Sequence, residues 1–339
     1  MDRWSRRQFV QGVGVAGLGL LAGCGRLPGQ VQAPPKVPRI GWLLSGSVDT
    51  RETPPPGVSP PVDAFFQGLR DMGYVDGQNV VVEWRASDRG EPRLRELADE
   101  LVRRPVDVLI GNVDTAQIAR QVTNTVPIVF VGCCDPVAAG LVASLARPGG
   151  NVTGVTIGVG DAQVGKLLEL LTAAAPSVSR VGILRDANQP PTTGALAIAA
   201  EALGLHVQSM DVRTADDLPG AFDVASRDHV DGLHVVQTPL IVHNEGLIAD
   251  LALKHHLPSI GRFRGYARAG GLLTYGPDLY ALHRRVATYV DRILKGAKPG
   301  DLPVEQPMTF EFIINLRTAQ ALGLTIPEHV LLQATEVIQ

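Results

Sequence analysis

The sequence predicts an α/β protein with two lobes, each built on a parallel, doubly wound β-sheet. Three observations predict this fold class. The continuous apolar run at 128–131 (IVFV) is typical of a strand buried on both faces, as in a parallel sheet. Strand, loop and helix patterns alternate four times up to that run, and the same alternation is found again after residue 158. The Pro- and Gly-rich break at 148–158 separates the two series, so we interpret it as the passage between the lobes.

The first series contains four strands and four helices. The helix at 91–104 is amphipathic, with Leu94, Leu97 and Leu101 on one side, and Gly73 ends the helix before it. A Thr- and Pro-rich loop at 49–61 is unusually long for a connection between a strand and a helix. We predict strands at 39–44, 79–84, 106–111 and 128–131, and helices at 62–72, 91–104, 115–123 and 137–145.

The second series repeats the pattern and then crosses back. We predict strands at 152–157, 180–184, 206–212, 232–236, 258–261, 271–275 and 309–315, and helices at 166–175, 193–203, 216–226, 244–255, 278–295 and 316–322. Asp278 can cap the long helix, and the Pro-rich stretch at 299–307 indicates another passage between lobes. We therefore expect a first lobe of residues 39–150 plus about 277–303, and a second of 151–276 plus about 304–339.

The amino-terminal 23 residues read as an export signal. Arg6 and Arg7 precede a hydrophobic residue, and an apolar, Gly-rich run follows at 12–23 that is shorter than a membrane-spanning helix. The run ends in LAGC, which resembles a lipobox in which Cys24 is acylated; an ordinary cleaved signal with an incidental cysteine is the alternative. The twin arginine indicates Tat export or is coincidental. Residues 24–38 would then be a tether, and the protein a membrane-anchored lipoprotein.

Composition and motifs exclude several classes of function. The net charge is −3, aromatic residues make up 5% of the chain, and no basic tract is longer than two residues, so we expect no nucleic-acid partner. The nucleophile elbow, the phosphate-binding loop and the HExxH zinc motif are all missing, and the eight histidines are scattered. We expect no catalytic set, no cofactor and no metal. Cys133 and Cys134 read as small buried thiols, since no metal or redox spacing surrounds them.

Small polar residues follow most of the predicted strands. The carboxyl ends of strands in open α/β sheets are where ligands bind, so we expect two sets of strand ends to face each other across a cleft. Arg262 could clamp a ligand carboxylate, Asp114, Asp135 or Asp186 could accept an ammonium group, and Phe263 and Tyr275 could form aromatic walls. Helix capping and turn formation are the alternative explanation for each site. The candidate ligand-binding residues are Ser45, Gly46, Ser47, Asn112, Asp114, Thr115, Cys134, Asp135, Asp186, Asn188, Gln237, Thr238, Arg262, Phe263 and Tyr275.

Several longer motifs make the sequence recognisable. They are 66–70 (FQGLR), 73–79 (GYVDGQN), 135–137 (DPV), 141–154 (LVASLARPGGNVTG), 275–278 (YGPD), 289–306, 314–316 and 321–327. Together they closely resemble the ABC-transporter substrate-binding proteins of the tryptophan/tyrosine type, many of which are lipoproteins. The resemblance covers residues 38–339. It implies a type 1 periplasmic-binding-protein fold, in which two Rossmann-like lobes are joined by three crossover segments and hold the ligand between them.

The strand ends depart from the usual pattern of that family. The chain has GNVDT at 111–115 where a small Gly-Thr-Pro-like turn is common, and Cys133, Cys134 and Asp135 where Gly-Gly-Asp is common. The resemblance therefore implies the framework more directly than aromatic amino-acid specificity.

The resemblance implies a solute-binding receptor of an ABC importer rather than an enzyme. We expect a monomer that captures a small polar or aromatic molecule, such as an amino acid, by closing like a Venus flytrap, and then docks on an ABC permease. Two alternatives remain. One is a lipoprotein sensor that reports to a signalling receptor, and the other is a cleft hydrolase that uses Asp114, Asp135 and Asp186 as acid and base.

Overall fold

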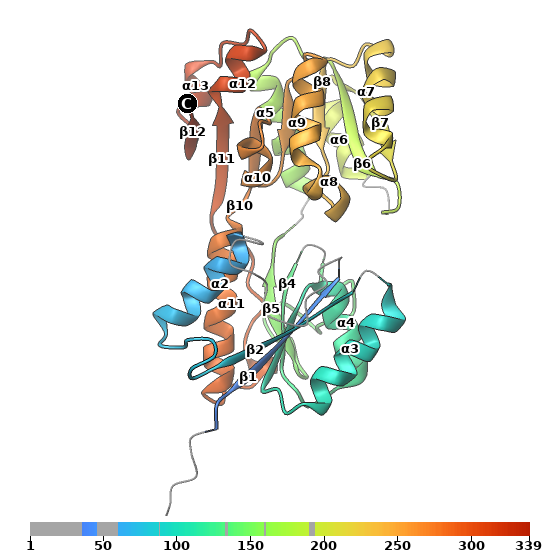
Figure 1. Ribbon diagram of the computed structural model, residues 1–339. Coiled ribbons are helices and arrows are strands. Elements are labelled where there is room, and N and C mark those ends of the chain that lie inside the picture. The colour runs from blue at the N-terminus through green and yellow to red at the C-terminus, as the bar shows by residue number, and fades with distance from the viewer. Residues whose placement is uncertain (1–35, 46–59, 88, 133–134, 159–160, 190–193) are drawn as a thin grey trace, which may run out of the picture. The chain divides into compact units, whose positions relative to one another are not determined.

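The computed structural model describes residues 36–45, 60–87, 89–132, 135–158, 161–189 and 194–339 (Figure 1). Pro38–Gln339 forms one compact unit, which contains two β-sheets and the helices that cover them. The predicted α/β class with parallel sheets is confirmed. Among the described residues, the pairing of β10 (Leu273–Pro277) with β11 (Phe310–Asn315) is antiparallel, and the other strand pairs are parallel.

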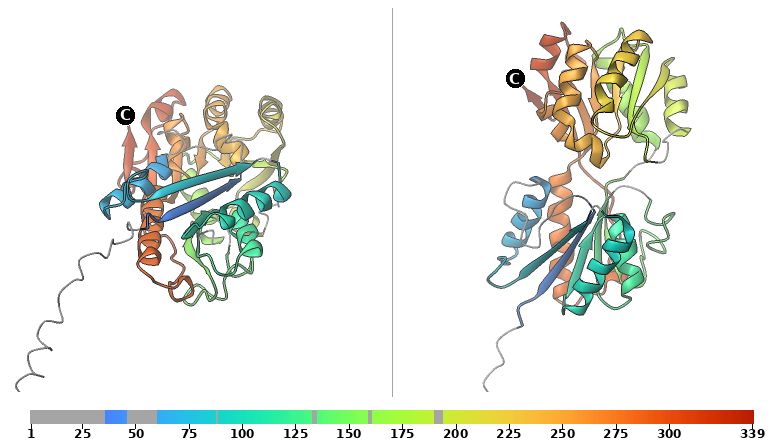
Figure 2. Two further views of the ribbon diagram at one scale, coloured as in Figure 1. Left: turned by 60° about the horizontal axis from the view of Figure 1, so that its bottom comes forward. Right: turned by 45° about the vertical axis from the view of Figure 1, so that its right-hand side comes forward.

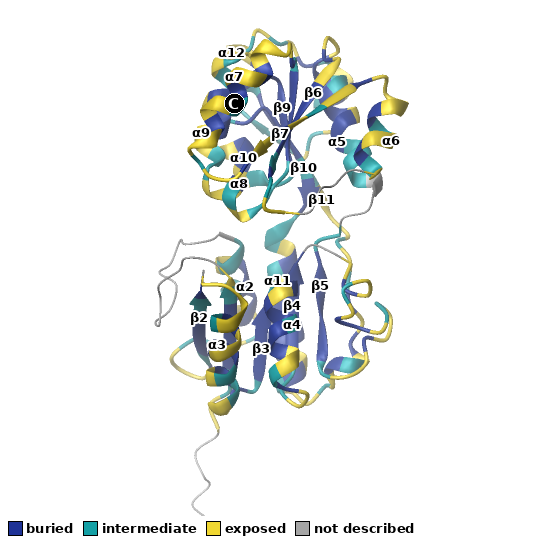
Figure 3. Cartoon of the chain, turned by 90° about the vertical axis from the view of Figure 1, so that its right-hand side faces the viewer, coloured by how far each residue is buried: buried dark blue, intermediate teal, exposed yellow. Residues whose placement is uncertain are grey.

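The first sheet has five parallel strands with helices on both faces. Its strand order is β2 (Val81–Ser87), β1 (Arg39–Ser45), β3 (Val108–Gly111), β4 (Ile128–Gly132) and β5 (Val152–Thr156). One face packs against α2 (Pro60–Asp71) and α11 (Leu279–Leu294). The other face packs against α3 (Glu91–Arg103) and α4 (Val113–Val122) (Figure 2). Figure 3 shows β3, β4 and β5 buried along their length.

The side chains of β1 show why this sheet needs two helical layers. Successive residues in a strand point to opposite faces, so Trp42 packs towards α2 and α11 while Leu43 packs towards α3 and α4. The Trp42 ring stacks on Trp84 with centroids 4.5 Å apart, and Phe65 of α2 meets Trp42 edge-on at 4.9 Å. These aromatic contacts hold α2 against the β1–β2 edge of the sheet.

The second sheet has seven strands. Their order is β12 (Glu336–Ile338), β11, β10, β9 (Ser259–Gly261), β8 (Gly232–Val235), β6 (Arg180–Asp186) and β7 (His206–Val212). One face packs against α5 (Asp161–Ala174), α6 (Gly194–Ala202), α12 (Leu316–Ala321) and α13 (Glu328–Leu331). The other face packs against α7 (Asp217–Arg227), α8 (Pro239–His243), α9 (Glu245–Lys254) and α10 (Arg264–Arg268).

The chain passes between the two sheets three times. The first passage leads from β5 to α5, and the second from β10 to α11, which packs on the first sheet. The third leads from the short 3₁₀ helix η1 (Pro299–Asp301) to β11 of the second sheet. Three passages agree with the crossover segments that the resemblance implied, while the exact lobe boundaries stay a prediction.

Two expectations for the segment between β4 and the first passage are wrong. Residues 152–156 were expected in the second lobe, but β5 pairs with β4 along its length and completes the first sheet. Gly154 permits this pairing, because a Cβ atom there would lie 2.1 Å from the carbonyl oxygen of Phe130. The helix expected at 137–145 is a series of turns. Gly140, with φ of 67°, is in the left-handed region and ends the first turn.

The elements that the sequence analysis missed are short. They are α8, α10, α13 and β12, each of three to five residues. A helix of four or five residues spans little more than one turn, so its apolar residues show no recognisable period. Strand β2 begins at Val81, two residues later than expected.

Candidate functional site

The carboxyl ends of the first sheet bring together two of the predicted residues. Asn112 precedes α4 as its N-cap, and its Oδ1 accepts a hydrogen bond from the Thr115 backbone N–H at 2.8 Å. The Asn112 amide also donates to Ser45 Oγ at 3.0 Å, which links the ends of β3 and β1. Asp114 is exposed in the first turn of α4. Gly46, Ser47 and Cys134 lie outside the described residues.

Thr115 has a structural role. Its side chain is fully buried, and its hydroxyl oxygen lies 3.0 Å from Asn112 Oδ1 and 3.3 Å from the Asn112 carbonyl oxygen. These contacts support the N-cap at Asn112, and the binding role predicted for Thr115 stays a prediction. Gly111 makes room for it, because a Cβ atom at residue 111 would lie 2.3 Å from the Thr115 hydroxyl.

Asp135 is exposed after β4 and forms an Asx turn. Its Oδ1 accepts hydrogen bonds from the backbone N–H groups of Val137 at 2.8 Å and Ala138 at 3.2 Å. The turn orients the carboxylate at the end of the strand, which is where the sequence placed a candidate ammonium acceptor.

At the end of β6, Asp186 and Asn188 are held by local hydrogen bonds. Asp186 is 6% exposed, and its Oδ1 accepts from the Asn188 backbone N–H at 2.8 Å. The Asn188 side chain donates to the Arg213 carbonyl at 3.2 Å. Beside them, Arg185 forms a fork with Asp211, which holds the pKa of the Asp211 carboxyl below its usual value. Burial of Asp186 argues against a direct ligand contact through its carboxylate, and the cleft hydrolase that would use it loses support.

Gln237 follows β8 at the same carboxyl edge of the second sheet, since β8 and β6 are parallel neighbours. Its Oε1 accepts from the backbone N–H groups of Arg262 at 2.6 Å and Phe263 at 2.9 Å, and its Nε2 donates to Glu245 Oε1 at 3.0 Å. Burial raises the pKa of the Glu245 carboxyl. Thr238 caps α8 through its hydroxyl. The side chain of Gln237 thus fixes the backbone of Arg262 and Phe263.

Arg262 faces the first passage. Its Nη2 donates to the carbonyl oxygens of Ile157, at 3.0 Å, and Gly158, and to Gln163 Oε1 at 3.0 Å. The guanidinium carbon lies 5.2 Å from the Phe263 ring centroid. The predicted bidentate clamp on a ligand carboxylate would compete with these contacts, and it stays a prediction.

Tyr275 packs beside the third passage. Its ring stacks on Phe310 of β11 with centroids 5.8 Å apart, and it meets Phe312 edge-on at 6.4 Å. Tyr275 and Phe263 are both partly exposed, as an aromatic wall requires.

Sequence reasoning missed a cluster of charges around Arg264, which we describe below. Arg264 stands two residues after Arg262, and this spacing was the one available signal. A groove of about 490 Å³ between α2 and α11 was also not predicted from the sequence. Its lining residues are Asp63, Ala64, Gln67, Arg70, Asp278, Tyr280, Ala281 and Arg284, none of which was a predicted ligand-binding residue.

Two features are missing from the described part of the chain. None of its helices combines the length and the apolar character that crossing a membrane requires. No group of three or more His, Cys, Asp or Glu side chains there could hold a metal ion.

The architecture defines the fold, and the family match defines the class of protein. The two sheets and three passages form the type 1 periplasmic-binding-protein fold. The chain belongs to the family described as ABC transporter substrate binding protein, whose model matches residues 55–338. Members of this family bind solutes.

Individual relatives span nearly the whole chain. A protein called tyrosine-binding protein, from Clostridioides difficile, is 26% identical over 315 residues, which are 92% of this chain and 90% of the relative. A solved structure of an ABC domain in complex with L-Trp, from Streptococcus pneumonia, is 26% identical with a TM-score of 0.72. A conserved domain protein from Vibrio cholerae is 27% identical with a TM-score of 0.74. Both structures cover 89% of this chain and are themselves covered completely.

Proposed function

We propose that this protein is the solute receptor of an ABC importer and that its ligand is an aromatic α-amino acid, tryptophan or tyrosine. The similarity to the structure solved with L-Trp, at 26% identity over 89% of the chain, carries the proposal. The relative called tyrosine-binding protein supports the same ligand class.

The candidate residues offer the chemistry that such a ligand needs. Ser45, Asn112 and Asp135 present hydroxyl, amide and carboxylate groups at the ends of the first sheet. A carboxylate can accept the α-ammonium group, and polar N–H and O–H groups can bind the α-carboxylate. Phe263 and Tyr275, at the ends of the second sheet, offer ring faces for the aromatic side chain.

In this proposal the ligand lies in a cleft between two lobes and stabilises the closed state, because it contacts both lobes only there. The lobes are those predicted from the sequence, with the first extended to include β5. The closed form then docks on a permease outside the cytoplasm. Anchoring through a lipid on Cys24, which lies outside the described residues, would keep the receptor at the membrane.

Ligand binding by the purified protein tests the proposal. Isothermal titration and thermal unfolding should detect L-Trp or L-Tyr, with glycine, L-leucine, glucose and adenosine as controls. A ligand at 100 times its dissociation constant adds about 2.7 kcal/mol to the free energy of unfolding. Stabilisation by glucose or adenosine, with no response to either aromatic amino acid, would refute the ligand class while leaving the receptor fold unaffected.

A further inference from the structure

The three passages between the sheets lie side by side. The Thr156 backbone N–H donates to the Glu305 carbonyl at 2.9 Å, which joins the first passage to the third. The Asp278 N–H donates to the Thr309 carbonyl at 3.2 Å, which joins the second to the third. The third passage is therefore hydrogen-bonded to both of the others. A change in the relative orientation of the two sheets must change its conformation.

Two arginine–carboxylate forks hold the third passage at its ends. From α11, Arg285 binds Glu305 through Nε and Nη2 at 2.6 and 2.5 Å, and this contact lowers the pKa of the Glu305 carboxyl. From α10, Arg264 binds Glu311 through the same two nitrogens, with Nε 3.3 Å from Oε2. Such forks fix both distance and direction. Between them Met308 is 92% exposed and residues 306–309 belong to no helix or strand, so we expect any bending of the third passage there.

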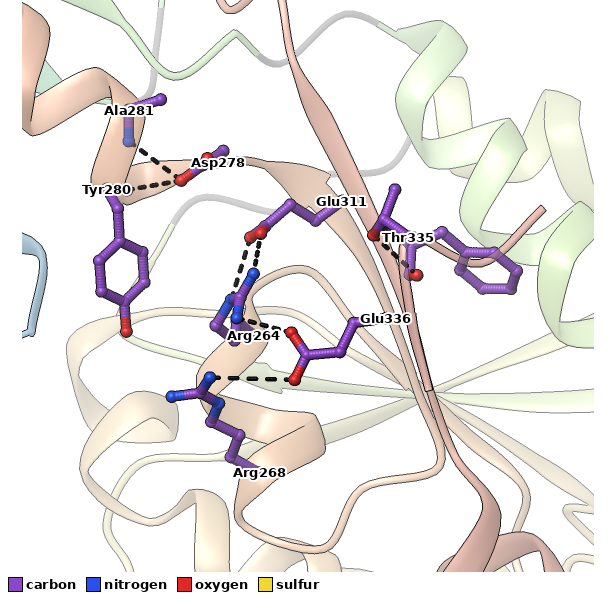
Figure 4. Close-up of polar contacts among 9 residues, drawn as sticks. Arg264, Arg268, Asp278, Tyr280, Ala281, Glu311, Thr335 and Glu336 are labelled. Carbon is purple, nitrogen blue, oxygen red and sulfur yellow. Dashed lines mark hydrogen bonds and ion pairs between the residues drawn. The ribbon is translucent and has the colours of Figure 1, made fainter. Parts of the chain in front are cut away.

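Arg264 also contacts strand β12 and the start of helix α11 (Figure 4). Its Nη1 donates to Glu336 of β12 at 2.6 Å, and its guanidinium carbon lies 5.6 Å from the ring centroid of Tyr280 at the start of α11. Arg264 therefore touches the start of β11, where the third passage ends, the edge strand β12 and the helix that follows the second passage. Its pKa is raised, chiefly by the Glu311 fork.

Arg262 and Arg264 flank Phe263, and each holds a different passage. Arg262 binds the carbonyl groups of the first passage, and Arg264 binds Glu311 of β11, where the third passage ends. Gln237 holds the backbone N–H groups of Arg262 and Phe263. Residues 262–264 are thus one short segment that carries a candidate aromatic contact, Phe263, and contacts the chain at two of the passages.

We propose that Arg262 and Arg264 are positioning residues that couple Phe263 to the passages, so that ligand contact at Phe263 sets the bend of residues 306–309. The inference rests on the proposed function. A ligand shifts a conformational equilibrium only through its different affinity for the two states, so weakening the coupling lowers both the affinity and the size of the closing movement.

Variants of Arg264 test the coupling. Arg264→Gln removes the charge and the fork, and Arg264→Lys keeps the charge but not the fork. The matched control is Arg268→Gln, on the same helix, since Arg268 is exposed and its ion-pair partner among the described residues is Glu336, at 3.8 Å. Titration should show a loss of aromatic amino-acid affinity of about tenfold for Arg264→Gln, a smaller loss for Arg264→Lys and none for Arg268→Gln. Small-angle X-ray scattering should show a smaller ligand-induced decrease in radius of gyration for Arg264→Gln than for the parent.

The double variant Arg264→Glu with Glu311→Arg restores an ion pair in the opposite sense, and partial recovery of affinity is expected. If Arg264→Gln lowers the melting temperature but keeps parental affinity and the parental decrease in radius of gyration, Arg264 is only structural and the inference is wrong. An equal effect of Arg268→Gln also overturns it. A parent protein that binds neither aromatic amino acid refutes the proposed function, and the inference falls with it.

Discussion

His234 makes the stability of this protein depend on pH. The side chain lies on β8, opposite Ile183 of β6 and Ile260 of β9, and is 6% exposed. Burial lowers its pKa from 6.5 to about 4, because a charged imidazole loses its hydration there. Between these two values the unfolded chain binds a proton that the folded protein does not bind. The free energy of unfolding therefore falls as the pH falls through this range and levels off below about pH 4.

The size of the effect follows from the two pKa values. A difference of about 2.5 between them corresponds to ~3 kcal/mol in total, at ~1.4 kcal/mol for each tenfold step. Most of it, ~2.5 kcal/mol, should be lost between pH 7 and pH 4.5.

Urea unfolding followed by circular dichroism measures this loss in the parent and in His234→Gln, whose side chain stays neutral throughout. Burial also lowers the pKa of His283, but that residue is common to both proteins and cancels in the difference. The parent should lose ~2.5 kcal/mol more than the variant. Parallel pH dependences in the two proteins would show that His234 is hydrated or charged in the folded state, and would refute the reasoning.

Two further predictions separate binding from folding at the first sheet. Thr115→Val removes a buried hydroxyl that contacts Asn112, so we expect a loss of about 1 kcal/mol in urea unfolding with unchanged ligand affinity; a tenfold loss of affinity would return Thr115 to the binding site. Asp135→Asn keeps the acceptor for the turn at Val137 and removes the charge, so titration should show an affinity loss of about tenfold at a nearly parental melting temperature. Asp135→Ala should add a small loss of stability, and an Asn variant with full affinity would exclude the charge from ligand binding.

The sequence predicted the large elements because their patterns are long. The apolar run at 128–131 is β4, and the stripe of Leu94, Leu97 and Leu101 is the buried face of α3. Strand β5 was assigned to the wrong sheet because its pairing with β4 depends on Gly154, whose close approach to Phe130 is a tertiary contact. Nothing in the local pattern at 152–156 indicates which of two sheets the strand joins.

The candidate site could be predicted only as far as the rule for strand ends extends. That rule correctly places Asn112 beside Ser45, since β3 and β1 are neighbours in the sheet. It cannot tell where a long side chain points. The partners of Arg262 at Ile157 and Gly158 lie more than 100 residues away in the chain. The same holds for Arg264 and Glu311, which are 47 residues apart.

Helix capping and ligand binding compete for the same side chains at these strand ends. Asn112 uses its carbonyl oxygen on the Thr115 N–H and its amide on Ser45, so replacing it alters α4 as well as any contact with a ligand. The side chains of Phe263 and Tyr275 have no such double role, because among the described contacts of the chain their rings neither cap a helix nor close a turn. Ligand preference can therefore change at the two aromatic positions without loss of a helix cap or a turn, whereas a change at the capping residues affects folding and binding together. Substitutions that exchange tryptophan for tyrosine preference should accordingly be found at Phe263 and Tyr275 before Asn112.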